Sequence, residues 1–203
     1  DHPTGFVRVA LDADTGGPDY EILEPVAWDA IAWTEALRAR AGEAAAVVFG
    51  SLAQRSSTSR RTIRRLCQAD ALRVFDVNLR PPYVERAVVE QSLRVADVVK
   101  LNDDELRRLR SWFDLATGTE EGMAALAAAF DCHTVCVTEG GQGAHLWRHG
   151  AYWHHSGYNV VVEDTVGAGD ALLAALLAGL LADTDADRLL ERAHRFGAYV
   201  AAP

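Results

Sequence analysis

The sequence predicts an α/β fold in which a mainly parallel sheet carries helices on both faces. Short apolar segments rich in valine alternate with longer segments that repeat their apolar residues at helical spacing. The connections are short, and several of the apolar segments end in polar or glycine-rich residues. Repeated strand–helix units of this kind form parallel sheets that bind ligands beyond the carboxyl ends of their strands. Functional residues are therefore expected at those ends.

The composition is that of a globular domain with a substantial core. The 203 residues are 49% hydrophobic, no apolar run is long enough to cross a bilayer, and the formal net charge is −9. Nucleic-acid binding needs clustered cations, and none dominates here. The three cysteines, Cys67, Cys132 and Cys136, fit free thiols in a reducing compartment. We therefore expect a cytoplasmic protein with no nucleic-acid or membrane partner.

The N-terminal part contains a hairpin and the first strand–helix units. Residues 5–23 predict a β-hairpin, because apolar and polar residues alternate on both sides of Gly16–Gly17. A helix is expected over 28–40. The glycine-bounded apolar run 44–50 is typical of a buried parallel strand.

The same alternation continues to the end of the chain. It predicts helices over 56–70, 82–96, 103–112, 119–130 and 187–201, strands over 72–78, 97–102 and 134–140, a second hairpin over 144–156, and a long apolar helix that follows Gly167. The second hairpin is expected to turn at His149–Gly150.

Four short motifs lie at the expected strand ends. They are DVNLRPP (76–82), NDDE (102–105), TEGGQG (138–143) and DTVGAGD (164–170). Each motif is short enough to recur by chance, so their order and spacing carry more information than any one of them.

The DTVGAGD motif opens the long apolar helix. The amides of Gly167, Ala168 and Gly169 would lack partners inside the helix. These residues carry at most a methyl group, which lets an anion approach the amides closely. Asp170 in the first turn can simply stabilise the helix dipole. Alternatively, the amides hold a phosphoryl group while Asp170 accepts the proton of an attacking hydroxyl. The chain has no Walker A motif.

The other three motifs each allow a structural and a functional interpretation. Asn102 and Glu105 could orient magnesium-bound water or could cap a helix. The glycines of TEGGQG could admit a ligand or form a tight turn. In DVNLRPP, Asp76, Asn78 and Arg80 alternate and should share one side of an extended segment, where Arg80 could bind a phosphate or join a salt bridge.

Together the segments FDVNLRPPY, KLNDDEL, VTEGGQGA and DTVGAGDA resemble the ribokinase-like, or PfkB-type, carbohydrate kinases. FGSLAQRS with FDVNLRPPY is most similar to the fructokinase and 2-keto-3-deoxygluconate kinase branch. The resemblance implies a Rossmann-like three-layer α/β/α core with part of a small β lid. It divides the chain into a lid hairpin (1–24) and a kinase core (25–203). It also implies ATP-dependent phosphorylation of a sugar or sugar acid, with Mg²⁺.

The family's motifs assign roles to matching residues here. The resemblance makes Asp170 the catalytic base and the 167–169 amides the anion hole, and it places Asn102 and Glu105 near the magnesium ion. The remaining matches are Thr138, Gly140 and Gly143 on the nucleotide side, Asn78 and Arg80 near phosphate or substrate, and Asp164 and Thr165 at a monovalent-cation site, most often for K⁺.

The resemblance leaves alternatives open. Family members have an N-terminal section of roughly one third of the chain that this sequence lacks, and in several of them the lid forms a homodimer. An inactive regulatory module that binds nucleotide or sugar, and a nucleoside kinase of the same fold, are the alternative functions. The substrate itself is not identified by these motifs.

Overall fold

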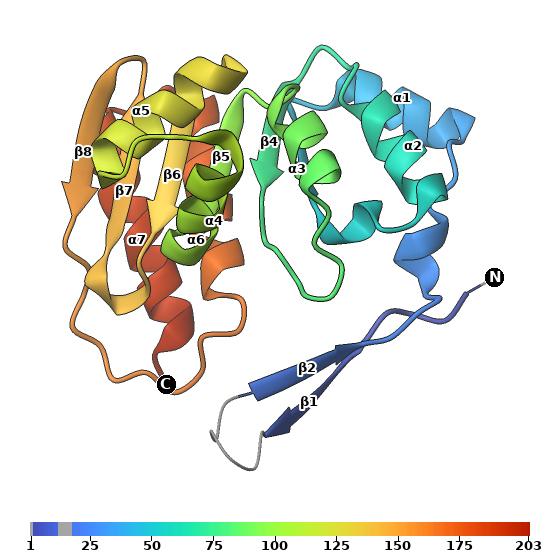
Figure 1. Ribbon diagram of the computed structural model, residues 1–203, viewed down its shortest axis with the longest axis horizontal. Helices are drawn as coiled ribbons and strands as arrows, with labels where there is room; N and C mark the ends of the chain where they lie inside the picture. Colours follow the sequence, from blue (N-terminus) through green and yellow to red (C-terminus); the bar gives the residue numbers. More distant parts are fainter. Residues whose placement is uncertain (1, 12–17) are drawn as a thin grey trace.

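The molecule consists of a small two-stranded sheet and a six-stranded sheet covered by helices (Figure 1). The computed structural model describes residues 2–11 and 18–203. In that part of the chain, no helix combines the length and apolar character that crossing a membrane requires.

The two-stranded sheet is the hairpin expected near the N-terminus. Strand β1 (Val7–Leu11) pairs antiparallel with β2 (Pro18–Ile22), and Val7 lies opposite Ile22. The turn expected at Gly16–Gly17 lies outside the described residues. The hairpin projects from the core, on the side toward which strand β4 runs (Figure 1).

The large sheet has the strand order β3-β4-β5-β6-β7-β8. Its strands are β3 (Ala46–Gly50), β4 (Leu72–Asp76), β5 (Val98–Asn102), β6 (Thr134–Thr138), β7 (Ala144–Arg148) and β8 (Ala151–His155). The first four are parallel, and β7 and β8 continue the sheet as an antiparallel hairpin. The mainly parallel sheet and the second hairpin predicted from the sequence are confirmed.

Helices cover both faces of this sheet. They are α1 (Glu35–Glu43), α2 (Ser57–Leu66), α3 (Arg86–Leu93), α4 (Asp103–Phe113), α5 (Thr119–Phe130), α6 (Ala168–Leu181) and α7 (Ala186–Ala201), with short 3-10 turns η1 (Ala27–Ala30), η2 (Leu52–Gln54) and η3 (Gly140–Gln142). Alternate strand residues point to opposite faces. Phe75 therefore packs in a core with α2 to α5, whereas Val74 packs in a second core with α6 and α7. This is the expected three-layer α/β/α arrangement.

Three details differ from the sequence-based expectations. The helix expected over 28–40 is divided into η1 and α1, because the side chain of Thr34 caps α1 by accepting from the amide of Leu37. The helix expected over 82–96 begins only at Arg86. Strand β3 is at the edge of the sheet, so it is only partly buried, and Val48 is 48% exposed.

Candidate active site

The DTVGAGD segment turns into α6 at its glycines. Gly167 is the N-cap and has a φ of 83°, which favours glycine, and α6 begins at Ala168. Asp170 lies in the first turn and is exposed. The amide of Ala168 donates to the carbonyl of Thr165 at 3.1 Å, so it is already engaged in this structure. The segment thus combines a glycine-rich helix start with an accessible carboxylate.

A cavity of about 410 Å³ lies beside this helix start. Its lining includes Gly50 at the end of β3, Asp76 and Asn78 at and after the end of β4, and Asp170 and Leu173 on α6. The carboxyl ends of two neighbouring parallel strands and the start of a helix therefore meet at one concave surface. This is where a parallel sheet is expected to bind a ligand.

A buried ion pair forms part of the floor of this site. Lys100 on β5 lies opposite Asp76, and its ammonium contacts both carboxylate oxygens at 3.2 and 3.3 Å. Burial raises the pKa of Asp76, the Lys100 charge opposes that effect, and the charge of Asp170 adds to the rise. A Cβ built at Gly169 would lie 3.1 Å from the Lys100 Nζ. The lysine is therefore directly beneath the first turn of α6.

Asn102 and Glu105 form a capping box at the start of α4. The side chain of Asn102 accepts from the Glu105 amide at 2.8 Å, and the Glu105 carboxylate accepts from the Asn102 amide at 2.9 Å. The second carboxylate oxygen of Glu105 accepts from the amide of Leu79 at 2.7 Å. Glu105 is buried, and this burial raises its pKa. The helix-capping interpretation is thus realised, and the same carboxylate anchors the loop after β4.

The donor set near Glu105 fits magnesium only through water. The described residues contain no group of three histidine, cysteine or acidic side chains placed to hold a metal ion. A carboxylate that accepts two amides still has lone pairs for water. Mg²⁺ often keeps several waters and takes few protein ligands. An ion here would therefore be held mainly by water and by oxygens of a bound ligand.

The segment after β4 is not extended as expected. Asn78 has a φ of 38°, so the backbone turns there and the alternation of side chains is broken. Asp76 and Asn78 line the cavity, whereas Arg80 is exposed and donates to the carbonyl of Leu79. The expectation that all three polar residues share one side is therefore wrong.

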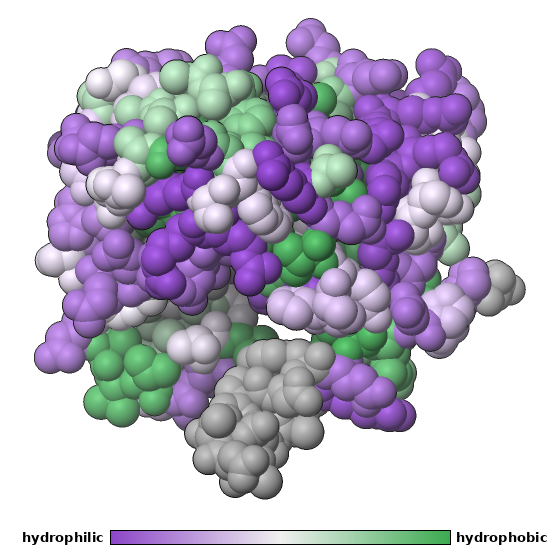
Figure 2. Space-filling model, viewed as in Figure 1, coloured by the Kyte–Doolittle hydropathy of each residue, from purple (hydrophilic) through white to green (hydrophobic). Residues whose placement is uncertain are grey.

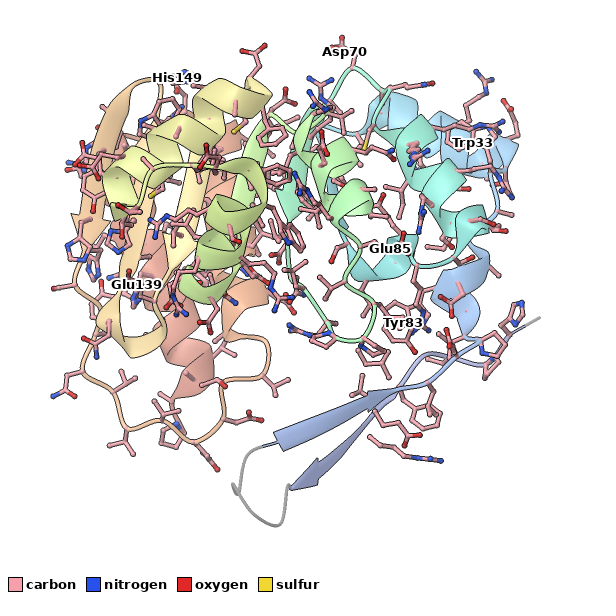
Figure 3. The ribbon with its side chains drawn as sticks, viewed as in Figure 1. Trp33, Asp70, Tyr83, Glu85, Glu139 and His149 are labelled. Atoms are coloured by element: carbon pink, nitrogen blue, oxygen red, sulfur yellow. The ribbon has the colours of Figure 1, made fainter. Side chains whose placement is uncertain are left out.

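The TEGGQG segment makes a tight turn after β6. Gly140 and Gly143 have φ values of 55° and 118°, and Thr138 ends the strand. A Cβ at Gly143 would lie 1.9 Å from the carbonyl oxygen of His155. The turn is therefore pressed against the end of β8. Glu139 lies at this end of the strands, and His149 lies at their opposite end (Figure 3).

The loop that leads into α6 is exposed. The Asp164 side chain accepts from the amide of Val166 at 2.9 Å, and Thr165 uses its carbonyl to accept from Ala168. Hydrophobic residues gather on the surface near the C-terminal end of α7 (Figure 2), and Val161 and Val162 of this loop are exposed. Asp164 and Thr165 are close to the start of α6, but their side chains do not line the cavity.

Sequence reasoning did not identify Lys100 as part of the site. It was visible only as the single lysine of the chain, within the otherwise apolar strand segment VVKL. A lone charge in a strand predicted to be buried is the signal that could have identified it.

The chain matches a known family over nearly its whole length. The family is described as pfkB family carbohydrate kinase, and the match covers residues 1–202. The fructokinase of Escherichia coli is 32% identical over 135 residues, which cover 61% of this chain and 43% of that protein. A putative sugar kinase of Pyrococcus horikoshii is 30% identical over 187 residues, which cover 88% of this chain and 56% of that protein.

Solved structures agree with the family match. A crystal structure of the uncharacterised sugar kinase from Pyrococcus horikoshii is similar with a TM-score of 0.79 and 27% identity, covering 99% of this chain and 65% of that one. A putative ribokinase II from E. coli has a TM-score of 0.81 at 20% identity, covering 100% of this chain and 66% of that one, and it shows the fold alone. The chain spans about half the length of the curated relatives that it matches.

Proposed function

Because the chain belongs to the pfkB family of carbohydrate kinases, we propose that it carries the phosphoryl-transfer part of an ATP-dependent sugar kinase. The observation that carries the proposal is the meeting of Asp170 and the glycine-rich start of α6 with the ends of β3 and β4 at one cavity. Residues 1–24 would serve as part of a lid, and 25–203 as the catalytic core.

In this mechanism Asp170 is the general base. Its carboxylate accepts the proton of a sugar hydroxyl, whose oxygen attacks the γ-phosphorus of ATP while the bond to the β,γ-bridging oxygen breaks and ADP leaves. Positioning and charge stabilisation carry most of such a reaction. The amides at 167–169 would face the transferred group, with Ala168 releasing its bond to Thr165. An exposed carboxylate next to a helix start suits both tasks.

Other residues would hold the two substrates. We assign Thr138, Gly140 and Gly143 to the nucleotide side, because the turn they form lies at the carboxyl edge of the sheet. A sugar kinase from Pyrococcus horikoshii at 27% identity has been solved in complex with ATP, which supports ATP as the donor. Asn78, which lines the cavity, and Arg80, on the same loop, would bind phosphate or sugar.

Cations would complete the site. Bound Mg²⁺ would neutralise part of the phosphate charge, and Asn102 and Glu105 would hold it through water. Asp164 and Thr165 would lie beside a monovalent cation such as K⁺. The acceptor is proposed to be a fructose-like ketose or a sugar acid, because a fructokinase is among the relatives at 32% identity.

The test is magnesium-dependent ADP release by the protein at its full native length, with fructose, 2-keto-3-deoxygluconate, ribose and adenosine as acceptors. We expect release with a ketose or sugar acid, and we expect Asp170→Asn to abolish it while calorimetry still detects ATP binding. Asp187→Asn is the matched control, because Asp187 is also an exposed carboxylate in the first turn of a helix.

Each alternative function has a distinct outcome. Release with adenosine alone would support a nucleoside kinase. ATP binding without release against every acceptor would support a regulatory module. Full turnover by Asp170→Asn would show that another residue is the base.

A further inference from the structure

Lys100 is a charged residue on a face of the sheet that packs in an apolar core. Its side chain points to the face covered by α6 and α7, as does that of Val98, which belongs to the core on that face. Its neighbour on β6 is Cys136, which is fully buried. Only 10% of the Lys100 side chain is exposed. A charged group in this layer therefore requires a physical explanation.

The ion pair with Asp76 does not supply that explanation. Removing a carboxylate and an ammonium from water costs about as much as their attraction returns, so an apolar pair of similar volume would often stabilise the fold equally well. The two residues are direct cross-strand neighbours on β4 and β5, where such apolar pairs are common. Stability alone does not account for the pair.

The helix above Lys100 makes its position less favourable still. The start of α6 carries the positive end of the helix dipole, and the Lys100 ammonium lies beneath Gly169 at that end. The ammonium and the positive helix end repel each other, and negative charge close to both would offset this repulsion. Asp76 supplies some of it on the sheet side. A phosphoryl group at the α6 amides would supply the rest, at the moment when its negative charge must be stabilised.

We infer that Lys100 is a positioning residue for phosphoryl transfer, whose buried charge acts through the first turn of α6 on the group held there. The inference rests on the proposed function. The Lys100 ammonium also compensates the negative charge of Asp76 at the cavity wall, so that this carboxylate does not oppose the approach of phosphates. Glu105 and Asp170 are the other carboxylates near this point, and Arg80 is the other cation whose charge reaches Asp76.

The first test is Lys100→Met, which keeps the length of the side chain and removes its charge. We expect kcat to fall by about tenfold to a hundredfold, which is less than the loss of about a hundredfold to a thousandfold when a donor in direct contact is removed. The KM for the sugar should change much less. An unchanged kcat in a folded variant would overturn the inference.

A double-mutant cycle separates the direct charge from the effect on Asp76. Lys100→Met is compared in the native background and in an Asp76→Asn background, where the lysine no longer has the Asp76 charge to compensate. If the lysine acts through the α6 turn, kcat falls in both backgrounds. If the fall disappears in the Asp76→Asn background, Lys100 serves only Asp76 and the inference is wrong.

A second ion pair between the same strands is the matched control. Arg73 on β4 and Asp97, just before β5, pair at the opposite end of these strands, with Nε 2.8 Å from Oδ2. The double variant Arg73→Met with Asp97→Asn should lower stability without changing kcat. A similar fall in kcat would show that any lost pair in these strands disturbs the site, which would also overturn the inference.

Ligand binding distinguishes a failure of this inference from a failure of the proposed function. If the native protein releases no ADP with any acceptor, the proposed function fails, and calorimetry with ATP and with adenosine still tests Lys100. We then expect Lys100→Met to weaken ATP binding by about tenfold and to leave adenosine binding unchanged. Equal ATP affinity in both proteins would overturn the inference.

Discussion

Single glycines determine how closely the turn after β6 approaches the end of β8. Gly143 and Gly140 both have positive φ, but their surroundings differ. A Cβ at Gly143 would overlap the His155 carbonyl oxygen, whereas a Cβ at Gly140 would meet nothing within 4 Å. A side chain at Gly140 would meet backbone strain alone, whereas one at Gly143, where ψ is −154°, would add a steric clash to a backbone conformation that is essentially restricted to glycine.

We expect Gly140→Ala to lower the free energy of unfolding by about 1–2 kcal/mol, the cost of a left-handed residue with a Cβ. Gly143→Ala should cost about 3 kcal/mol or more, because the end of β8 must also move. Urea denaturation of both variants measures the difference. Equal losses would mean that the β8 end yields freely to the new side chain.

At this scale the sequence identified the residues that have a local signature. Gly167, Gly169 and Asp170 stand in a short motif whose position after an apolar loop and before an apolar helix could be predicted. Lys100 could not be placed, because its proximity to α6 depends on Gly169, which is 69 positions later in the chain yet directly above it in space. Contacts of this kind are created only when the sheet and the helix assemble.

The packing of α7 against α6 sets the position of the proposed anion site. Gly197 on α7 lies against the first turn of α6, and a Cβ there would be 3.1 Å from the carbonyl oxygen of Ala168. The backbone of α7 thus supports the helix start that carries Asp170. A larger side chain at 197 must displace that turn.

We expect Gly197→Val to lower the free energy of unfolding by about 1–3 kcal/mol through overpacking, and to lower kcat as the start of α6 shifts. Gly42→Ala is the control, because Gly42 is exposed on α1 with nothing within 4 Å of its Cβ position. That variant should stabilise the protein by about 0.5–1 kcal/mol with unchanged kcat. Thermal unfolding and ADP release measure both effects. Native kcat in Gly197→Val would contradict the proposed coupling.

Most elements could be predicted from periodicity, and the exceptions have physical causes. Strands β4, β5 and β6 and helices α4, α5 and α7 lie where their apolar spacing placed them, because packing and local preference agree there. Residues 28–40 read as one helix but contain Thr34, whose hydroxyl gives α1 a new start. The apolar run of β3 suggested full burial, yet its place at the sheet edge depends on topology, which a local pattern does not contain.

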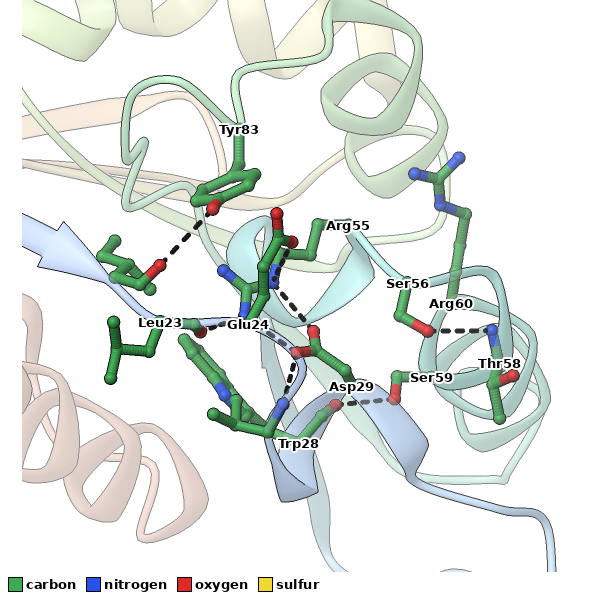
Figure 4. Close-up of polar contacts among 12 residues, drawn as sticks. Leu23, Glu24, Trp28, Asp29, Arg55, Ser56, Thr58, Ser59, Arg60 and Tyr83 are labelled. Carbon is green, nitrogen blue, oxygen red and sulfur yellow. Dashed lines mark hydrogen bonds and ion pairs between the residues drawn. The ribbon is translucent and has the colours of Figure 1, made fainter. Parts of the chain in front are cut away.

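At the scale of the whole molecule, Arg55 joins the root of the hairpin to the core. Arg55 follows η2, and its side chain is only 6% exposed. Its Nη2 donates to the carbonyl of Leu23 at the root of the hairpin, and its Nε and Nη2 each lie 2.8 Å from an oxygen of Asp29 (Figure 4). The guanidinium also stacks on the rings of Trp28 and Tyr83, at 4.9 and 4.5 Å from their centroids.

This cluster determines how firmly the hairpin is held. Tyr83 adds a bond of 3.4 Å from its hydroxyl to the carbonyl of Ile22, at the end of β2. The chain segments that meet here are far apart in sequence, so no periodic pattern indicated that Arg55 would be buried.

We expect Asp29→Asn to lower the free energy of unfolding at pH 7 by about 2–4 kcal/mol, because it leaves the buried Arg55 charge with only the more distant Glu24 carboxylate, 3.9 Å away. The hydrogen bonds from Arg55 hold the pKa of Asp29 below its usual range. Its contribution to stability is therefore fully present above the unfolded-state pKa of about 3.9 and is lost as the pH falls through the folded-state value.

Urea denaturation should show a constant difference in the free energy of unfolding between native and variant proteins from about pH 5 to 8, narrowing below about pH 4. Glu35→Gln breaks an ion pair with Arg38 on the exposed surface of α1, where solvent screens the charges, and should leave the free energy of unfolding nearly unchanged. A difference between native protein and Asp29→Asn that persists unchanged into acid would show that shape rather than charge makes Asp29 the anchor of the hairpin.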